Sequence, residues 1–385
     1  MAGMGKTDNH LNMESRTGTS VVLNGKKYLY FAGTSYFQLH SHPALIKAAN
    51  EATQQYGIGT ATTRAMTGNT PLLEKMEHTL ASFFSTEDAV YLPSGYLCSL
   101  AGLKALDELG LYQVIFLDEG SHYSLAEGAA ATGKKIITFR NRDPEDLAAQ
   151  LKKHLARGER PMMASDGLFP VMGNLAPVRD YLKLAEQYDG VLWIDDAHGV
   201  GILGAHGRGT CEALATSSDR IYLGATLSKA FGAYGGIIAG NGEFIRKIRS
   251  GSVFTGSSAP MNAAVAAGIK GVELVLENNH LRNDLWNIAR YLREALQHMG
   301  IPVETLYIPE VHGTVPIFSF AHKDAATMIK IHNYLMKQGI YTQYTSYRGA
   351  GAEGVLRVVV SSAHKKVEIV RLTHTLREAF IKIKT

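Results

Sequence analysis

A single lysine in a glycine-rich stretch is the first feature of this 385-residue sequence that could do covalent chemistry. Lys229 stands within residues 224–236, GATLSKAFGAYGG, beside the hydroxyl residues Thr226 and Ser228. A lysine that acts as a nucleophile needs close neighbours and a lowered pKa. Small neighbours let a flat ring approach the backbone, and hydroxyl groups can hold a phosphate. The stretch therefore indicates a covalently bound, phosphate-bearing ring.

An acidic pair precedes this lysine along the chain. In residues 193–204, WIDDAHGVGILG, the polar residues Asp195, Asp196 and His198 follow the end of an apolar run. Pyridoxal phosphate (PLP) requires a lysine for its Schiff base and a carboxylate at its pyridinium nitrogen. The order therefore predicts a PLP site that contains Lys229 and Asp195. Two structural interpretations stay open: a solvated loop lysine and an aspartate that caps a helix.

A scaffold of alternating strands and helices must position these residues. Short apolar runs alternate with helical patterns, and they end in the polar or glycine-rich segments PSGY, DEGSH, SDG, DDAHG and GATLSK. This alternation predicts an α/β fold with a mostly parallel sheet covered by helices. In such sheets the ligand lies beyond the carboxyl ends of the strands. We therefore expect these segments to converge on one site.

The pattern changes near residue 278, where long helical segments and short strands suggest a smaller α+β domain. We predict an N-terminal segment over residues 1–50, a large PLP-binding domain over 51–277 and a small C-terminal domain over 278–385. Residues 21–33 predict a hairpin that turns at Asn24 and Gly25. Helical spacing predicts helices over 43–56 and 71–84.

Composition limits the classes of function. The chain is 45% hydrophobic and 19% charged with a net charge of +4, and the absence of a dense Lys/Arg run argues against nucleic-acid binding. Cys98 and Cys211 lie far apart without metal-ligand spacing, so we expect no metal site and a reduced, cytoplasmic protein. The N-terminus lacks the apolar segment of a secretion signal. No apolar run approaches the roughly 20 residues of a membrane span.

Over nearly its whole length the sequence resembles the α-oxoamine synthases, a family of fold-type I PLP-dependent enzymes. Three segments carry the resemblance most strongly: DDAHGVGILGAHGRG, GATLSKAFGAYGG and PSGYLCSLAGL. The resemblance implies a fold-type I PLP transferase, in which helices flank a mostly parallel sheet in the large domain and a smaller α+β domain follows. It also implies a homodimer with a shared active site.

The resemblance assigns roles to four residues around the ring. Lys229 matches the lysine that forms the Schiff base, and Asp195 matches the aspartate that keeps the pyridine nitrogen protonated. His122 matches the histidine that stacks on the ring face, and His198 matches a histidine near the ring hydroxyl. Each histidine could instead be a packed loop residue. Asp196 is expected to be a neighbour of the ring rather than its ligand.

Further residues are expected to hold the phosphate. Gly95 and Tyr96 open a predicted helix, and backbone N–H groups at a helix start suit a phosphate. Thr226 matches a phosphate-binding hydroxyl of the family, and Ser228 is a weaker candidate. Thr255 falls where the family places a hydroxyl that reaches the phosphate of the partner subunit, although an ordinary strand-end role stays open.

The substrate side of the site departs from the family pattern. Arg357, in VLRVVVSSAH, matches an arginine near the substrate carboxylate, which a guanidinium binds well; Arg348 is the alternative. Arg64 matches a family arginine for which a structural role stays open. Pro170 stands where many members have serine, so one side-chain donor is absent. This departure indicates an unusual amino-acid or acyl partner.

Together these assignments predict a PLP-dependent acyltransferase that condenses a small amino acid with an acyl-CoA, or an acyl group on a carrier, and releases carbon dioxide to give an α-amino ketone. The alternative is an aminotransferase or other PLP carbanion chemistry on an amino acid, because a fold does not decide the reaction. A third hypothesis is a paralogue that binds PLP without catalysis.

Overall fold

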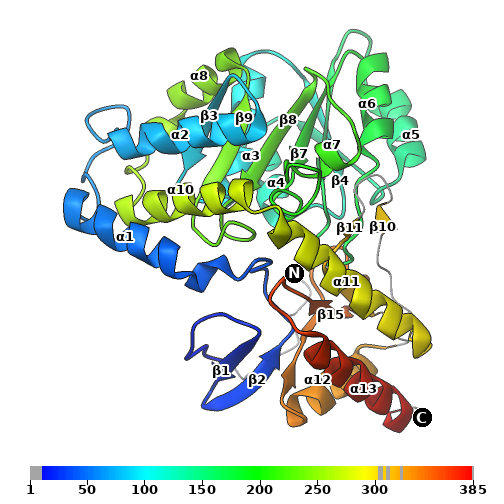
Figure 1. The fold of residues 1–385 in the computed structure, drawn as a ribbon. Helices are drawn as coiled ribbons and strands as arrows, with labels where there is room; N and C mark the ends of the chain where they lie inside the picture. Colours follow the sequence, from blue (N-terminus) through cyan, green and yellow to red (C-terminus); the bar gives the residue numbers. More distant parts are fainter. Residues whose placement is uncertain (1–10, 302–306, 309–312, 321–323, 384–385) are drawn as a thin grey trace. The chain divides into compact units, whose positions relative to one another are not determined.

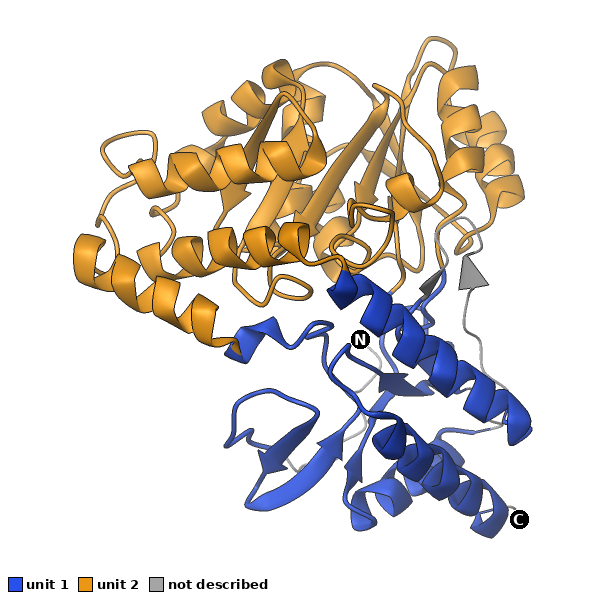
Figure 2. Ribbon diagram, in the orientation of Figure 1, with its two compact units in different colours: residues 1–41, 170–174, 280–385 blue, residues 42–169, 175–279 orange. Residues whose placement is uncertain are grey.

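The computed structural model describes residues 11–301, 307–308, 313–320 and 324–383 (Figure 1). The chain divides into two compact units (Figure 2): unit 1 contains residues 1–41, 170–174 and 280–385, and unit 2 contains residues 42–169 and 175–279. The first ten residues of the predicted N-terminal segment lie outside the described residues. The division at residues 50 and 277 stays a prediction about domains.

Unit 2 is built on a seven-stranded sheet of order β3-β9-β8-β7-β6-β4-β5. Among these strands only β9 runs antiparallel to its neighbours β3 and β8, and the other pairings are parallel. The prediction of a mostly parallel sheet is therefore confirmed. The strands are β3 (Asp88–Leu92), β4 (Val114–Asp118), β5 (Lys135–Phe139), β6 (Pro161–Asp166), β7 (Val191–Asp195), β8 (Ile221–Thr226) and β9 (Gly236–Gly240).

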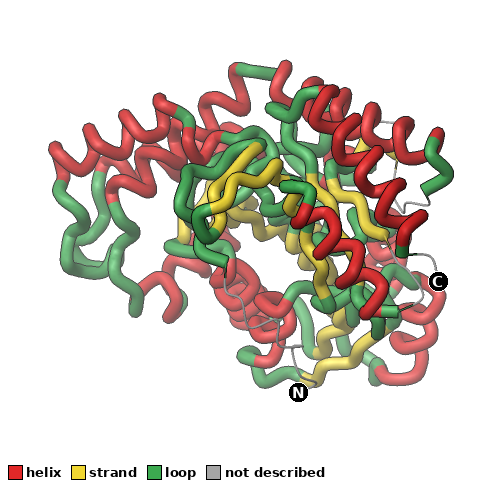
Figure 3. The backbone as a smooth tube through the Cα atoms, turned by 90° about the horizontal axis from the view of Figure 1, so that it is seen from below, coloured by secondary structure: helices red, strands yellow, loops and turns green. Residues whose placement is uncertain are grey.

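Helices cover both faces of this sheet. Successive side chains of a strand point to opposite faces, so neighbouring residues of β4 show what packs on each face. Ile115 and Leu117 of β4 belong to one buried apolar cluster with residues of α3 (Tyr96–Glu108), α4 (Tyr123–Ala130) and α8 (Gly242–Ser250). Val114 and Phe116 belong to a second cluster with residues of α5 (Pro144–His154) and α6 (Val178–Gln187). Helices thus pack against both faces of the sheet. In the tube view, helices are red and strands are yellow (Figure 3).

The helices of unit 2 begin where the sequence supplies start signals. Pro71 opens α2, and the Thr70 hydroxyl accepts a hydrogen bond from the Leu73 N–H, which caps the helix. Gly102 allows α3 to approach the sheet closely, since a Cβ there would lie 2.1 Å from Trp193 of β7. The helices are α1 (Pro43–Tyr56), α2 (Pro71–Phe84), α3 (Tyr96–Glu108), α4 (Tyr123–Ala130), α5 (Pro144–His154), α6 (Val178–Gln187), α7 (Thr210–Ala213), α8 (Gly242–Ser250), α9 (Ser252–Thr255) and α10 (Asn262–Glu277).

A buried ion-pair network ties α2 to neighbouring segments of unit 2. Arg64 Nη1 lies 2.6 Å from Glu77 Oε1, and both side chains are at most 8% exposed. Glu77 Oε2 lies 3.0 Å from Arg249 Nη2, and Glu77 Oε1 also accepts the Tyr91 backbone N–H. These contacts favour the structural interpretation of Arg64.

The described residues of unit 1 form two three-stranded sheets, a short two-stranded ribbon and the helices α11, α12 and α13. The predicted hairpin is confirmed: β1 pairs antiparallel with β2, and Asn24 and Gly25 at its turn both have positive φ. The elements are β1 (Ser20–Leu23), β2 (Lys26–Tyr30), η1 (Leu39–Ser41), α11 (His280–His298), β10 (Tyr307–Ile308), β11 (Gly313–Thr314), β12 (Ile317–Phe320), α12 (Ala325–Lys337), β13 (Ile340–Tyr341), β14 (Gln343–Thr345), β15 (Val355–Val359) and α13 (Lys366–Lys382).

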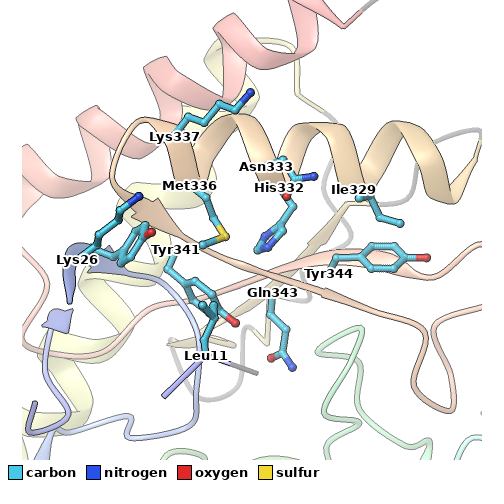
Figure 4. Close-up of a pocket in the computed structure, with 11 residues that line it drawn as sticks. Leu11, Lys26, Ile329, His332, Asn333, Met336, Lys337, Tyr341, Gln343 and Tyr344 are labelled. Carbon is cyan, nitrogen blue, oxygen red and sulfur yellow. The ribbon is translucent and has the colours of Figure 1, made fainter. Parts of the chain in front are cut away.

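A cavity of about 760 Å³ opens on unit 1 between α12 and the strands β2, β13 and β14 (Figure 4). His332 of α12 packs edge-on against the Tyr341 ring at 5.7 Å between ring centroids, and Tyr30 stacks on Tyr341 at 5.6 Å. Burial lowers the pKa of His332 from its ordinary value. Aromatic packing of a neutral histidine, rather than ion pairing, therefore forms this wall of the cavity.

Candidate active site

Unit 2 has a cavity of about 240 Å³ at the carboxyl ends of three parallel strands. Asp166, Asp195 and Thr226 are the last residues of β6, β7 and β8, and all three line it. This is where an open parallel sheet is expected to bind its ligand. The lining residues are Ser94, Gly95, Tyr96, His122, Ser124, Asp166, Asp195, Ala197, His198, Thr226, Ser228, Lys229 and Tyr234. The structure thus brings together every residue predicted to bind cofactor except Thr255.

Lys229 lies in the loop between β8 and β9. Two backbone hydrogen bonds close this loop, from Leu227 N to Gly235 O at 2.9 Å and from Ala233 N to Leu227 O at 3.1 Å. Leu227 and Phe231 are fully buried. The apolar residues on either side therefore anchor the loop, and Lys229 lies at the cavity wall.

The two adjacent aspartates after β7 have different surroundings. Asp195 lines the cavity, and its carboxylate accepts the Ala197 N–H at 3.2 Å and lies 3.5 Å from the Ser124 hydroxyl. Asp196 is fully buried and accepts hydrogen bonds from the backbone N–H and the hydroxyl of Thr210. Burial raises the pKa of Asp196 to about 6. Asp196 therefore holds the loop after β7, and Asp195 is the carboxylate available to a ligand.

His122 lies at the start of α4 and caps this helix. Its Nδ1 atom accepts the Ser124 N–H at 3.1 Å and lies 2.7 Å from the Ser124 hydroxyl. The backbone N–H of His122 donates to Asp166 Oδ1 at 3.1 Å. Because these contacts fix the backbone and one ring nitrogen, the imidazole is held at the cavity edge. The buried His198 lines the cavity in the turn after β7.

Small and hydroxyl residues form a cradle at the start of α3. A Cβ on Gly95 would lie 2.6 Å from Thr226 Cβ and 2.7 Å from Thr226 Oγ1, so only glycine fits against this threonine. The hydroxyls of Thr226 and Ser228 lie 2.9 Å apart. A helix start and two hydroxyls are a suitable donor set for a phosphate group.

Tyr96, the first residue of α3, lies at the rim of this cradle. Its hydroxyl donates to Glu127 Oε2 at 2.5 Å, and this hydrogen bond raises the pKa of Tyr96 to about 12. The ring packs edge-on against His122 with centroids 6.1 Å apart.

This set of side chains fits PLP. A lysine and a carboxylate line one cavity, and the cradle at Gly95 supplies donors for the phosphate. An amine, an anion and a phosphate cradle are the three groups that PLP requires from a protein.

Two predicted residues lie elsewhere. Thr255 ends α9, where its hydroxyl donates to the Gly251 carbonyl at 3.1 Å. Arg357 belongs to β15 of unit 1, and its Nε donates to the Pro170 carbonyl at 2.7 Å. The Arg357 Nη2 atom is buried and has no hydrogen-bond partner among the described residues. Burial lowers the pKa of this guanidinium.

Sequence reasoning assigned no individual role to five lining residues: Ser94, Ser124, Asp166, Ala197 and Tyr234. Ser94, Asp166 and Ala197 nevertheless lie in segments predicted to converge on the site. Ser124 follows His122 by two residues at a helix start, and this spacing is a usable signal because it allows the histidine to cap the helix. Asp166 gave only the signal of a polar residue at a strand end.

Within the described part of the chain, no helix has the length and apolar character needed to cross a membrane.

Comparisons with known proteins identify related chains. The sequence model of the family "Aminotransferase class I and II" matches residues 28–376. The 8-amino-7-oxononanoate synthase of Thermoanaerobacter pseudethanolicus is 30% identical over 362 residues, covering 93% of this chain and 89% of the relative. The 8-amino-7-oxononanoate synthase 1 of Bacillus subtilis is 30% identical over 359 residues, with 93% and 89% covered.

A solved structure shows the same fold. The Sphingomonas wittichii serine palmitoyltransferase superposes with a TM-score of 0.88 at 23% identity, covering 97% of this chain and 92% of that protein. The similarity therefore extends through both units and is not confined to the cavity.

Proposed function

Because this chain belongs to the α-oxoamine synthase family of fold-type I PLP-dependent enzymes, we propose that it condenses a small amino acid with an acyl thioester to give an α-amino ketone. It is a PLP-dependent acyltransferase, and its relatives are named for the synthesis of an amino ketone. Acyl-CoA is the proposed donor, with an acyl group on a carrier protein as the alternative.

One observation carries the proposal. Lys229, Asp195 and the cradle formed by Gly95 and Thr226 line a single cavity at the carboxyl ends of the parallel strands. When bound there, PLP stabilises negative charge on the α-carbon of an amino acid.

Lys229 is the proposed covalent anchor and proton carrier. Its Nζ atom would bind the cofactor before substrate enters, then take the α-proton of the amino acid and return a proton to the product carbon. Asp195 would hold a proton at the pyridine nitrogen through its negative charge. Condensation at the thioester carbon would release the free thiol, and the carboxyl group of the amino acid would leave as carbon dioxide.

The remaining cavity residues would bind and orient the cofactor. His122 would lie over the ring face, and His198 would lie near the ring hydroxyl. The hydroxyls of Thr226 and Ser228 and the start of α3, at Gly95 and Tyr96, would hold the phosphate.

Arg357 is the proposed partner of the substrate carboxylate, with Arg348 as the alternative. Its support is the buried Nη2 atom without a hydrogen-bond partner among the described residues, because a buried guanidinium is costly unless an anion accompanies it. The backbone carbonyl of Pro170 orients the Nε side of this guanidinium. Proline in place of serine takes away a hydroxyl but keeps this carbonyl contact.

We propose a cytoplasmic homodimer in which Thr255 reaches the phosphate in the partner's site. Mixed dimers test this arrangement. A dimer of one Lys229→Ala chain and one Thr255→Ala chain would contain one doubly defective site and one intact site. Cofactor binding in the mixed dimer at half the wild-type stoichiometry and with wild-type affinity supports sharing. Uniformly weak binding refutes it.

The reaction is tested by measuring free-thiol release from a panel of acyl-CoA thioesters, with glycine, alanine and serine offered in turn. Release that depends on one amino acid establishes the synthase reaction and identifies both substrates. Lys229→Ala should abolish release, and substantial residual turnover would contradict the assignment of the lysine. A 2-oxo acid formed from an amino acid without thioester would favour the aminotransferase alternative. PLP binding without turnover of any amino acid would favour the paralogue that binds PLP without catalysis.

A further inference from the structure

A second carboxylate, Asp166, lines the same cavity as Asp195. Asp166 ends β6, is only 3% exposed, and lies directly opposite Asp195 in the register of the parallel strands β6 and β7. Its Oδ1 atom accepts the backbone N–H of His122 at 3.1 Å. The proposed function assigns no role to this residue.

The two strand ends together hold the start of α4. Asp166 binds the His122 backbone, and Asp195 Oδ2 lies 3.5 Å from the hydroxyl of Ser124, which in turn contacts the His122 ring. The backbone of His122 is therefore tied to β6, and its side chain is tied to β7 through Ser124. Loss of the Asp166 contact would leave the His122 N–H without this acceptor, while the side-chain contact to Ser124 would stay in place.

Groups of negative and of positive charge surround the Asp166 carboxyl group. Burial raises its pKa well above the ordinary value, and the charges of Asp195 on β7 and Asp118 on β4 raise it further. The His122 N–H and the Lys229 ammonium act in the opposite direction. Because two neighbouring carboxylates do not both ionise readily, the buried Asp166 is the one whose surroundings favour the protonated form.

We propose that Asp166 is a positioning residue that carries a proton on Oδ2, holds the His122 backbone through Oδ1, and leaves Asp195 as the charged carboxylate in the cavity that Lys229 lines. This inference rests on the proposed function, because it assumes that His122 and Asp195 contact PLP. A neutral Asp166 keeps its acceptor for the His122 N–H and adds no second negative charge beside the pyridinium position.

The substitutions Asp166→Asn and Asp166→Ala separate the two parts of this proposal. Asparagine matches a protonated aspartate in shape and keeps the acceptor oxygen, whereas alanine removes the acceptor and leaves a buried N–H without its partner. PLP dissociation constants are measured by absorbance titration of the cofactor-free protein, without substrate. The pH dependence of the bound cofactor's absorbance is recorded for each variant, and Asp195→Asn serves as the charge-removing reference.

We expect Asp166→Asn to bind PLP within about threefold of wild type and with the same absorbance midpoint in pH. Asp166→Ala should weaken binding by about 5- to 150-fold, the range for a buried donor without its acceptor. Asp166→Ser, which is too short to reach the N–H, replaces the alanine variant if thermal unfolding shows that the latter does not fold.

Two results would overturn the proposal. If Asp166→Asn weakens PLP binding or shifts the absorbance midpoint as strongly as Asp195→Asn does, Asp166 acts as an ionised group. If the folded alanine or serine variant binds PLP like wild type, the contact to His122 does not position the site. Both measurements use PLP alone, so they remain decisive even if no thioester proves to be a substrate.

Discussion

The cradle at Gly95 gives a sharp test of the phosphate site. The substitution Gly95→Ala adds one methyl group, which would lie 2.6 Å from Thr226 Cβ and 2.7 Å from Thr226 Oγ1. Carbon atoms in contact are normally about 3.5–4.0 Å apart. Since Thr226 ends a strand in the middle of the sheet, the start of α3 has to move away by about 1 Å.

A displacement of this size stretches hydrogen bonds between a bound phosphate and one side of the cradle beyond their usual length of about 3.2 Å. A hydrogen bond to a charged group contributes about 1.5–3 kcal/mol. Loss of one such bond therefore predicts a PLP dissociation constant about 10- to 150-fold above that of wild type.

The assay is absorbance titration of cofactor-free protein with PLP and, separately, with pyridoxal, which lacks the phosphate. Gly95→Ala should weaken PLP binding and leave pyridoxal binding close to wild type. Gly59→Ala is the matched control, because a Cβ there has no neighbour within 4 Å. An unchanged PLP constant in Gly95→Ala, or an equal loss for pyridoxal, would refute the assignment of the cradle to the phosphate.

Three further predictions concern stability and substrate binding. Glu77→Gln should lower the free energy of unfolding by urea by about 3–5 kcal/mol, because it leaves two arginines without their shared buried anion. The control Glu273→Gln, which removes the partly exposed ion pairs to Lys75 and Lys270, should lower it by less than about 1 kcal/mol. Equal losses in the two variants would contradict the buried network. Arg357→Lys should raise the KM of the amino acid about tenfold or more with a smaller change in kcat, whereas an unchanged KM would favour Arg348. The pKa of Asp196 is raised to about 6 in the folded state, so its proton stabilises the fold below about pH 4 and this contribution is lost as pH rises through about 6. The unfolding free energy of wild type relative to Asp196→Asn should therefore fall by about 1–3 kcal/mol across that window, and a difference independent of pH would contradict the burial argument.

Elements with local start and stop signals could be predicted from the sequence. The helices over 43–56 and 71–84 have the predicted bounds, since a proline occupies the first turn and a capping residue precedes it. The hairpin at Asn24 and Gly25 is confirmed because these two residues adopt the positive φ that its turn requires. In these cases the information lies within a few residues of the element.

Strand β9 could not be found in this way. Its sequence, GIIAG, has only three residues between glycines, and it follows a glycine-rich loop. Its conformation depends on pairing with β3, far away in the sequence, and with β8 on its other side. The order of the sheet is likewise a property of these distant pairings, so the pattern predicted parallel strands but not the antiparallel one among them.

The residues of the site also differ in whether their signal is local in the sequence or depends on distant strands. Lys229 and Asp195 stand out because their neighbours in the sequence, hydroxyls and glycines in one case and an apolar strand in the other, already indicate chemistry. Asp166 ends an equally apolar strand, PMMASD, and nothing beside it distinguishes a positioning carboxylate from the polar end of any strand. Its significance arises from the register of β6 against β7, which places it opposite Asp195, and from the start of α4, which supplies the His122 N–H. A residue that acts through a neighbouring strand can therefore be recognised only once the sheet is known, whereas a residue that contacts the cofactor through its own loop can be recognised earlier.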